Sequence, residues 1–449
     1  MTQQQSITET AVPRLHYGWV IVLALALLGG AGSVLSSTQS LYSQQIWGGL
    51  LSADRVWQFV SAGSTVVSLF LLPFLGGLYD RHSVRPYLLA GGLIQSFAFV
   101  GLTLTEAPAL LTLLRATRQL SGQLLGTLAT VKLLPAWFEK RLGLAYALVG
   151  LSTSCIGIFG SQLVSRQYAV ATTHDMEWQL PCRVVAVCTL LLVLVAVLLI
   201  RDAPAQKGLR PFGAQAPAPY TSELDVGRPL AQLKKNTVFL LFLAGQVCFG
   251  AAYSIQNSIV SSFWSYSGVY HPRFDFKMLS NISLAVTALS LILLGSLYDR
   301  IGLPPFLVGV SVLTLFSAIV LLQPSRSATQ WYVFRFLYDM SGGLRGSLCI
   351  FTVITLFGRS QVTRASALVK VGVDLGSGLL LLLFGAPFAI LEYSGGLLEN
   401  LPLERTFQYA FFVAALLALS SIPLMLSAIR RASAETVKPE AGVTEEKPV

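Results

Sequence analysis

The stretch GGLYDRHSVRP, residues 76–86, forms a charged turn between two apolar runs, and GSLYDRIGLPP repeats it at residues 295–305. The two copies share Gly, Leu, Tyr, Asp, Arg and the final Pro at matching positions, almost half of the 449-residue chain apart. A repeat at a fixed offset indicates a duplicated structural unit. Because each copy joins apolar runs long enough to cross a bilayer, about 20 residues, the sequence predicts two homologous membrane halves.

The composition is typical of a polytopic membrane protein. Hydrophobic residues make up 54% of the chain, charged residues only 12%, and the mean hydropathy is +0.66; a soluble domain carries about 25% charged residues. The five Cys residues have neither metal-ligand nor disulfide spacing. The sequence contains no nucleophile elbow and no His-based acyltransferase motif. We therefore expect a protein that is not an enzyme and that has no metal site and no cofactor.

Twelve apolar runs predict transmembrane helices, six in each half, so the fold class is all-α. We expect a cytoplasmic N-terminal segment (1–16), an N-terminal half (17–200), a cytoplasmic linker rich in Pro, Gly and charge (201–236), a C-terminal half (237–430) and a cytoplasmic tail (431–449). The predicted spans are 17–42, 56–78, 87–105, 109–131, 142–164, 180–200, 237–262, 277–298, 305–323, 330–357, 364–389 and 406–429.

The distribution of Lys and Arg predicts the orientation, because cytoplasmic loops carry an excess of both residues. With the N-terminus in the cytoplasm, the inside segments hold 19 Lys and Arg residues and the outside segments hold 7. This bias places both termini and the linker in the cytoplasm. We expect the chain to lie in the plasma (inner) membrane. The net charge of +10 then serves topology and contact with anionic lipid, and binding to nucleic acid is not expected.

The predicted helices differ in polarity with a period of three. Helices 3, 6, 9 and 12 are almost wholly apolar, whereas helices 1, 4, 7 and 10 carry most of the polar groups. Polar groups inside a bilayer must face protein or water, so we expect four inner helices around a hydrated cavity. Gln39 in helix 1, and Gln256 and Asn257 in helix 7, are candidate substrate ligands. Hydrogen bonds between helices are the alternative.

With these features in place, the chain resembles the major facilitator superfamily from about residue 17 to residue 430. The stretch 76–86 is similar to that superfamily's signature G-x-L-x-D-R-x-G-R-R/K between helices 2 and 3, and Arg118 with Gly122 resembles the R-x-x-x-G core of its helix-4 signature. Ser83 and Val84 stand where the family prefers Gly and Arg. The signature is matched at Gly76, Leu78, Asp80, Arg81 and Arg85.

Three further stretches resemble one branch of that superfamily, the oxalate/formate exchangers and monocarboxylate transporters. They are HYGWVIV (16–22), WFEKRLGLAYALVG (137–150) and RDAPAQKGLRPFG (201–213). The resemblance implies a carrier of small carboxylates with a cationic residue on helix 11, a role that Lys370 would fill. The Arg that the branch often carries in helix 8 has no counterpart here.

Seven charged residues fall inside the predicted spans. A charge at the centre of a lipid-facing helix costs about 2.5–3.5 kcal/mol, so these side chains must face inward and be paired or hydrated. Five are cations and two are carboxylates, and a surplus of buried positive charge attracts anions. The residues alone therefore predict an anionic substrate. The seven are Arg115, Arg118, Arg335, Asp339, Arg345, Lys370 and Asp374.

The candidate substrate cations are Arg118, Lys370 and Arg335. For Arg118 the alternative is a bond to neighbouring backbone carbonyls, and for Lys370 it is a structural ion pair. Arg335 matches Arg115 in the repeat, and symmetric residues more often serve the scaffold or an outer gate.

The remaining charges, Asp339, Asp374 and Arg345, are expected to form charge pairs or to couple protons. Arg335 lies one turn from Asp339 and Lys370 one turn from Asp374, so each pair shares a helix face. Structural pairing is the favoured interpretation, and titration in a proton-coupled cycle is the alternative.

The repeated turns are predicted gating loops. Asp80, Arg81 and Arg85 lie at the cytoplasmic ends of helices 2 and 3, and Asp299 and Arg300 repeat the first two. Asp80 can pair across the interface of the halves with a helix N-terminus, where the helix dipole favours a negative charge. The resemblance implies that such contacts exist only when the cytoplasmic side is shut. The alternative is a role in topology alone.

We therefore expect a secondary transporter that moves a small organic anion, a monocarboxylate above all, by alternating access. It would act as an exchanger or as a proton symporter, with protons and membrane lipid as further partners. A proton-coupled carrier of another small polar solute and a non-transporting membrane sensor with the same fold are the alternatives.

Overall fold

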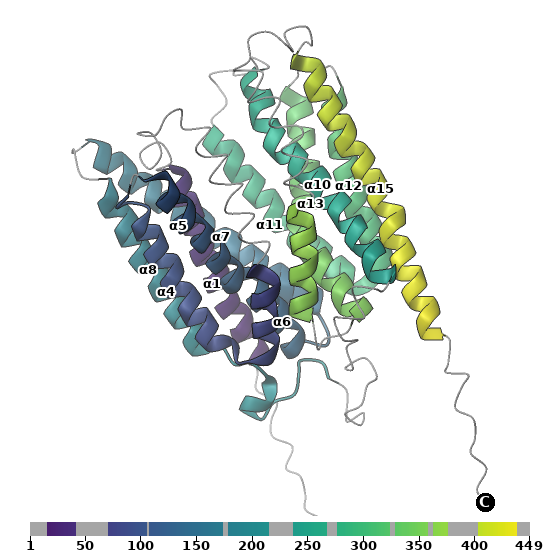
Figure 1. Cartoon of the computed structure of the whole chain (residues 1–449), viewed down its shortest axis with the longest axis horizontal. Coiled ribbons are helices and arrows are strands. Elements are labelled where there is room, and N and C mark those ends of the chain that lie inside the picture. The colour runs from purple at the N-terminus through teal and green to yellow at the C-terminus, as the bar shows by residue number, and fades with distance from the viewer. Residues whose placement is uncertain are drawn as a thin grey trace, which may run out of the picture.

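The protein is described by a computed structural model that covers residues 16–41, 71–105, 107–173, 178–214, 237–266, 276–323, 328–357, 362–375 and 403–437. These residues form two groups of helices that lie side by side, one from each half of the sequence (Figure 1). This arrangement confirms the all-α membrane architecture. Six helices are long and apolar enough to span a membrane: Gly18–Ser36, Leu142–Gln167, Gln179–Leu199, Thr237–Gln256, Leu303–Leu322 and Gln408–Ala432.

Helix 4 of the N-terminal half is interrupted. It runs as α5 (Pro108–Gln123), passes through one turn of π-helix, η1 (Leu124–Leu128), and continues as α6 (Ala129–Trp137). The other helices of this half are α1 (Gly18–Leu41), a helix over 71–81, α4 (Val84–Gly101), α7 (Leu142–Thr173) and α8 (Gln179–Leu199).

The C-terminal half repeats this order with a regular fourth helix. That helix, α13 (Ala328–Phe357), is α-helical throughout. The other helices are α10 (Thr237–Tyr266), α11 (Phe276–Ile301), α12 (Leu303–Leu322), a helix over 362–375 and α15 (Leu403–Val437).

Most predicted spans agree with these helices to within a few residues, but some helices are longer. Helix α7 continues to Thr173 and α15 to Val437, beyond the expected ends at 164 and 429. The apolar run marks the part of a helix that lies in hydrocarbon, whereas the backbone hydrogen bonds continue into the polar region. Residues 42–70 and 376–402, which include parts of predicted helices 2 and 11, lie outside the described residues.

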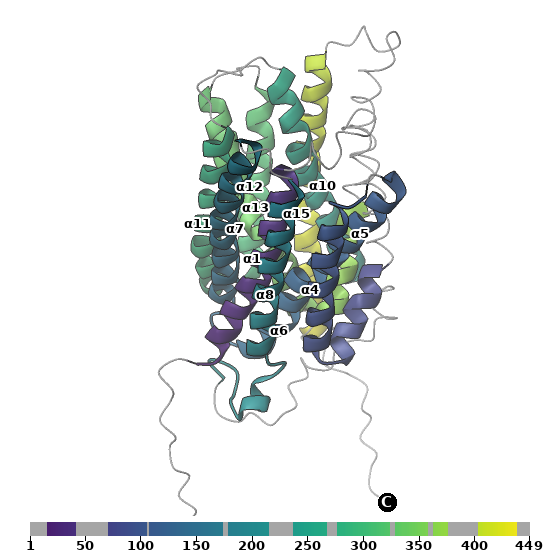
Figure 2. The ribbon, with the colours of Figure 1, turned by 90° about the vertical axis from the view of Figure 1, so that its left-hand side faces the viewer.

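The two halves share apolar packing at one end of the molecule. We call this the gate end, the end at which α1 begins and α15 ends (Figures 1 and 2). One core cluster there contains residues of both halves, such as Val84, Leu134, Val369 and Met425. The two other clusters each lie within one half. Among the described residues the halves are therefore joined by a common core at the gate end and have separate cores towards the opposite end.

Part of the expected linker is packed against the N-terminal half. Phe212 forms a β-bridge with Phe138, and Trp137 donates its indole N–H to the Arg201 carbonyl at 2.9 Å. His16 and Trp19 make edge contacts with the Phe212 ring. The stretches 16–22, 137–150 and 201–213, which carry the resemblance to one branch of transporters, thus meet in one aromatic cluster. Residues 215–236 of the linker lie outside the described residues.

Helices 3 and 9, expected from the sequence to be almost wholly apolar, carry polar residues on the faces that they turn towards the protein. Helix α4 buries Gln95, and α12 buries Ser311, Thr314 and Ser317. The opposite faces of these two helices are apolar, so the average composition of each helix hides its few polar residues. A polar side chain in such a helix can face only protein, so these positions mark internal contacts.

Candidate functional site

Two aspartates join the halves at the gate end. Asp80, at the end of the helix over 71–81, accepts a hydrogen bond from the backbone N–H of Arg364 at 3.1 Å. Asp299 of α11 accepts bonds from the backbone N–H groups of Gly143 (2.9 Å) and Leu144 (3.1 Å). Each carboxylate thus caps the first turn of a helix in the other half, where the helix dipole favours a negative charge. The two contacts are related by the sequence repeat.

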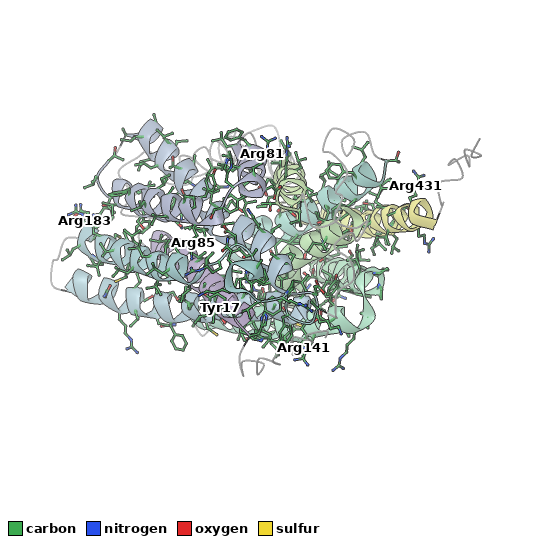
Figure 3. All side chains as sticks on the ribbon, turned by 90° about the horizontal axis from the view of Figure 1, so that it is seen from below. Tyr17, Arg81, Arg85, Arg141, Arg183 and Arg431 are labelled. Carbon is green, nitrogen blue, oxygen red and sulfur yellow. The ribbon has the colours of Figure 1, made fainter. Side chains whose placement is uncertain are left out.

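The Asp80 contact is sheltered from solvent. Burial raises the pKa of the Asp80 carboxyl above its usual value, and the hydrogen bond from Arg364 N–H opposes this rise. Arg81 and Arg300, which follow the two aspartates, are exposed. Figure 3, a view from the gate end, shows Arg81 and Arg85 on the N-terminal half.

The loop that carries Asp80 is fixed by bonds within its own half. The Lys132 ammonium donates to the backbone carbonyls of Tyr79 and His82, the latter at 2.8 Å. Arg85 donates to the Ile200 carbonyl at 2.7 Å, and Asp202 accepts from the Val84 N–H at 3.0 Å. The loop is therefore fixed to helix 4 and to the end of helix 6. If the two halves move apart as rigid bodies, Asp80 moves with the N-terminal half and its contact with Arg364 breaks.

Gly76, the first residue of the first repeat copy, lies where the two halves approach closely. A Cβ atom at Gly76 would lie 3.0 Å from the Ala367 Cβ and 3.2 Å from the Thr363 carbonyl oxygen. At Gly77 a Cβ atom would meet the Arg364 side chain at 3.8 Å, an ordinary contact. Gly76 thus permits the helix over 71–81 to approach the helix over 362–375 of the other half.

Replacing Gly76 by Ala is expected to disfavour the closed gate end. Overpacking costs about 1–3 kcal/mol, which is at least about a fivefold change in the ratio of closed to open molecules. The distance between spin labels at Glu139→Cys and Arg431→Cys, both exposed at the gate end in different halves, would report it in a background without the native cysteines. Gly77→Ala is the control, and an equal effect of the two variants would contradict this account.

Arg118 of helix 4 contacts helix 1. Its Nη1 donates a long hydrogen bond, 3.5 Å, to the Ser36 hydroxyl, and among the described residues its buried Nε has no hydrogen-bond partner. The same face of helix 4 continues with Gly122 and Gly126. A Cβ atom at Gly122 would meet only the Gln95 amide nitrogen, at 3.9 Å, and at Gly126 it would meet nothing within 4 Å. This face of helix 4 is therefore loosely packed.

Two charges of helix 10, Arg335 and Asp339, form a local network. Arg335 makes an ion pair with Asp339 at 2.9 Å, and its guanidinium donates to the Ser283 hydroxyl of α11, with Nε to Oγ at 3.0 Å. It also lies 5.6 Å from the ring centre of Tyr338. The pairing expected from the spacing of Arg335 and Asp339 is present. These contacts are those of a residue that ties α13 to α11.

The charges of helix 11 pair in the same way. The Lys370 ammonium lies 3.0 Å and 3.1 Å from the two carboxylate oxygens of Asp374. The side chains of Lys370 and Asp374 remain 28% and 20% exposed. The pair can therefore be reached by water, in contrast to Asp339, whose side chain is 5% exposed.

One candidate substrate ligand, Gln256, is bonded to a neighbouring helix of its own half. Gln256 is fully buried; its amide donates to the Thr314 carbonyl at 3.2 Å and accepts from the Ser317 hydroxyl at 2.6 Å. Gln256 thus makes the interhelical bonds that were the alternative to substrate binding. The side chains of Gln39, Asn257 and Arg345 lie outside the described ones.

Two features of this region have no counterpart in the sequence interpretation. Gln95 is 3% exposed and lies between helices 1 and 4, although a single polar residue in an apolar helix could have drawn attention to it. Tyr79 donates its hydroxyl to the Leu124 carbonyl at 2.9 Å, where the π-helical turn begins. Apart from the glycine at 126, the sequence contains no signal for that turn.

Two repeated six-helix halves, charges inside the spans and reciprocal contacts at one end define a polytopic membrane protein with the architecture of a transporter. The model of the Major Facilitator Superfamily matches residues 21–291 and 270–449. The chain therefore belongs to the major facilitator superfamily. No curated protein matches the chain in sequence.

Solved transporters share the fold at low sequence identity. A bacterial homologue of the iron transporter ferroportin, in the outward-facing state, matches with a TM-score of 0.69 and 14% identity, over 93% of this chain and 100% of that chain. The proton:xylose symporter XylE matches with 0.61 and 14%, over 90% and 94%. A bacterial homologue of the human lysosomal transporter Spinster, inward-facing, matches with 0.56 and 15%, over 95% and 99%. At these identities the likeness concerns the fold.

Proposed function

We propose that the chain is a secondary transporter of a small organic anion, with monocarboxylates as the first class to test. In this proposal it works by alternating access as an exchanger or a proton symporter. Its gate end faces the cytoplasm of the cell, as the excess of Lys and Arg on that side favours. The closed contacts of Asp80 and Asp299 then correspond to an outward-facing state, the state in which the ferroportin homologue was solved.

Arg118 is the observation that carries the anion proposal. Among the described residues, Asp339 and Asp374 are already paired with Arg335 and Lys370, and no carboxylate lies within ion-pair distance of Arg118. A guanidinium within a span is costly unless it is paired or hydrated. A carboxylate substrate supplies the missing charge and accepts two parallel hydrogen bonds from the guanidinium.

Lys370 and Asp374 suit a coupling role in this proposal. Both side chains are partly exposed, so a proton or a substrate carboxylate can reach them and compete for the existing ion pair. Exchange without proton movement requires no change in this pair, whereas symport does. Arg335, in contrast, is proposed to be structural, because Ser283 and Asp339 satisfy its guanidinium.

Two of the structurally similar transporters, or the proteins they are homologous to, act on other solutes, and those solutes are the alternatives to an organic anion. Xylose is neutral and iron is a cation. A surplus of positive charge inside the spans disfavours a metal cation as substrate and gives no advantage to a sugar. A proton-coupled carrier of another polar solute and a non-transporting sensor remain the competing functions.

We expect purified protein in liposomes to take up radiolabelled formate, acetate or oxalate with saturation, and to leave xylose and Fe²⁺ outside. The positive charge near Arg118 supports this order of preference. If a lower pH outside the liposomes than inside accelerates uptake, transport is by proton symport. If uptake depends on a carboxylate loaded inside the liposomes, transport is by exchange. Uptake of xylose or Fe²⁺ alone, or of no solute, would overturn the anion proposal in favour of the alternatives.

A further inference from the structure

The residues between α6 and α7, which join helix 4 to helix 5, are bonded to the linker segment 208–213. We call this segment the strap. The backbone N–H groups of Glu139 and Lys140 donate to the Phe212 carbonyl at 3.1 Å and 3.2 Å. The Phe212 N–H in turn donates to the Trp137 carbonyl at 2.8 Å. One residue of the strap therefore binds three backbone groups of the connection between helices 4 and 5.

The end of the strap is held close to this connection. The Phe212 ring contacts the rings of His16 and Trp19, with ring centres 5.5 Å and 5.8 Å apart. Gly213 follows with φ +85°, and a Cβ atom there would lie 2.6 Å from the Lys140 Cβ atom. Position 213 thus requires glycine both for its backbone conformation and for the close approach to Lys140.

The connection ends in a strained residue. Arg141 has φ +61°, and among the described residues it is the only non-glycine residue with a positive φ. The left-handed conformation is disfavoured about 5- to 30-fold for such a residue. The Arg141 side chain is exposed at the gate end (Figure 3), so side-chain packing does not hold this conformation. The two residues before Arg141 are bonded to the strap, and the strap therefore fixes the backbone that leads into Arg141.

Arg141 stands at the start of α7 and cannot cap this helix with its side chain. Its carbonyl accepts the first bond of the helix, from the Ala145 N–H at 3.0 Å. Side chains favoured at this position accept from the next N–H groups of the helix, whereas a guanidinium has no acceptor. Those N–H groups, of Gly143 and Leu144, are bound by Asp299 of the other half. Asp299 thus supplies the cap that α7 lacks.

We propose that the strap positions the gate contact: by holding the backbone before Arg141, it places the first N–H groups of α7 opposite Asp299. This inference rests on the proposed alternating access, in which the Asp299 contact keeps the gate end closed. When the strap is released, Arg141 leaves the left-handed region and the first turn of α7 changes direction, so the contact weakens. Phe212 and Gly213 are therefore positioning residues that act on the gate end through α7.

Gly213→Ala tests this inference, because the added Cβ atom pushes the strap away from Lys140. The ratio of open to closed molecules should rise by about 2- to 30-fold, the range for loss of one helix cap. Spin labels at Ser83→Cys and Arg431→Cys, both exposed at the gate end in different halves, would measure it in a background without the native cysteines. Gly208→Ala is the matched control, since Gly208 also has a positive φ, +65°, but a Cβ atom there would meet nothing within 4 Å.

Three further variants separate positioning from a general loss of packing. Phe212→Ala removes the ring contacts of the strap without adding an atom, and it should shift the ratio in the same direction. In an Asp299→Ala background, Gly213→Ala should cause no further shift, because the contact on which the strap acts is already absent. Arg141→Gly adopts the left-handed conformation without the strap, so it should reduce the effect of Gly213→Ala.

Two results would overturn the inference. The first is an equal shift in Gly208→Ala and Gly213→Ala, or an equal shift of Gly213→Ala with and without Asp299. The second is a wild-type distance distribution in both Gly213→Ala and Phe212→Ala while Asp299→Ala lengthens the main distance. Absence of carboxylate uptake by the wild-type protein would overturn the proposed anion transport and not the role of the strap, which the distances decide.

Discussion

Arg118→Ala is expected to lower carboxylate uptake at subsaturating substrate by about 30- to 4,000-fold. Truncating one partner of a buried, hydrogen-bonded charge pair costs about 2–5 kcal/mol, and each 1.4 kcal/mol is a factor of ten. Arg118 has a hydroxyl at 3.5 Å as its recorded bonding partner, so its removal breaks few contacts in the empty protein. The loss should therefore fall on transport, measured as initial uptake into liposomes, and leave the melting temperature nearly unchanged.

Two further variants make this result interpretable. Arg118→Lys keeps the charge but not the paired donors of the guanidinium, so it should recover part of the uptake. Arg183→Ala removes an exposed arginine of α8, which Figure 3 shows at the edge of the N-terminal half, and should transport normally. If Arg118→Ala unfolds in detergent while its remaining folded fraction transports at the wild-type rate, Arg118 is part of the scaffold.

The second large effect is expected from the double variant Asp80→Ala with Asp299→Ala. Loss of a helix cap costs about 0.5–2 kcal/mol, and loss of the charge at the helix N-terminus about 0.3–1 kcal/mol more. Together the two contacts are worth about 1.6–6 kcal/mol, which is a shift of at least about 15-fold towards the open gate end. The spin-label pair at positions 139 and 431 should then show a longer main distance without any substrate.

Asp202→Ala provides the matched control for this prediction. Asp202 also caps a helix, by accepting from Val84 N–H at 3.0 Å, but it lies in the linker segment that packs on the same half as Val84. Its loss should lower the melting temperature, but because Asp80 and Asp299 remain, the spin-label distances should change much less than in the double variant. Equal distance changes in Asp202→Ala and in the double variant would mean that general weakening, and not the loss of inter-half contacts, opens the gate end.

Much of the architecture followed from the sequence, because the repeat fixes two halves and the apolar runs fix the helices. The i,i+4 spacing also predicted the pairs of Arg335 with Asp339 and of Lys370 with Asp374, which the structure contains. Both predictions depend on local geometry, and local geometry is encoded in spacing. The roles of these residues in transport stay predictions.

The direction of single polar side chains was not predictable in the same way. Gln256 lies in a helix rich in polar groups, yet it faces α12, while Gln95 lies in an apolar helix and faces helices 1 and 4. Helical periodicity says which residues share a face, but which neighbour a face meets depends on the packing of all helices. The packing of 201–213 on the N-terminal half was hidden for a related reason, since its Pro and Gly residues suit both a loose linker and a tight turn.

The π-helical turn of helix 4 changes the direction in which the side chains after it point, relative to those before it. Arg118 and Lys132 are 14 residues apart, and in a regular α-helix, at 100° per residue, they would point within about 40° of each other. The extra residue absorbed by η1 displaces the inner part of the helix by about 100°. Arg118 therefore faces Ser36 of helix 1, while Lys132 reaches the carbonyls of Tyr79 and His82 in the opposite direction. A single inserted position thus separates, on one continuous helix, the face proposed to meet the solute from the face that holds the loop carrying Asp80.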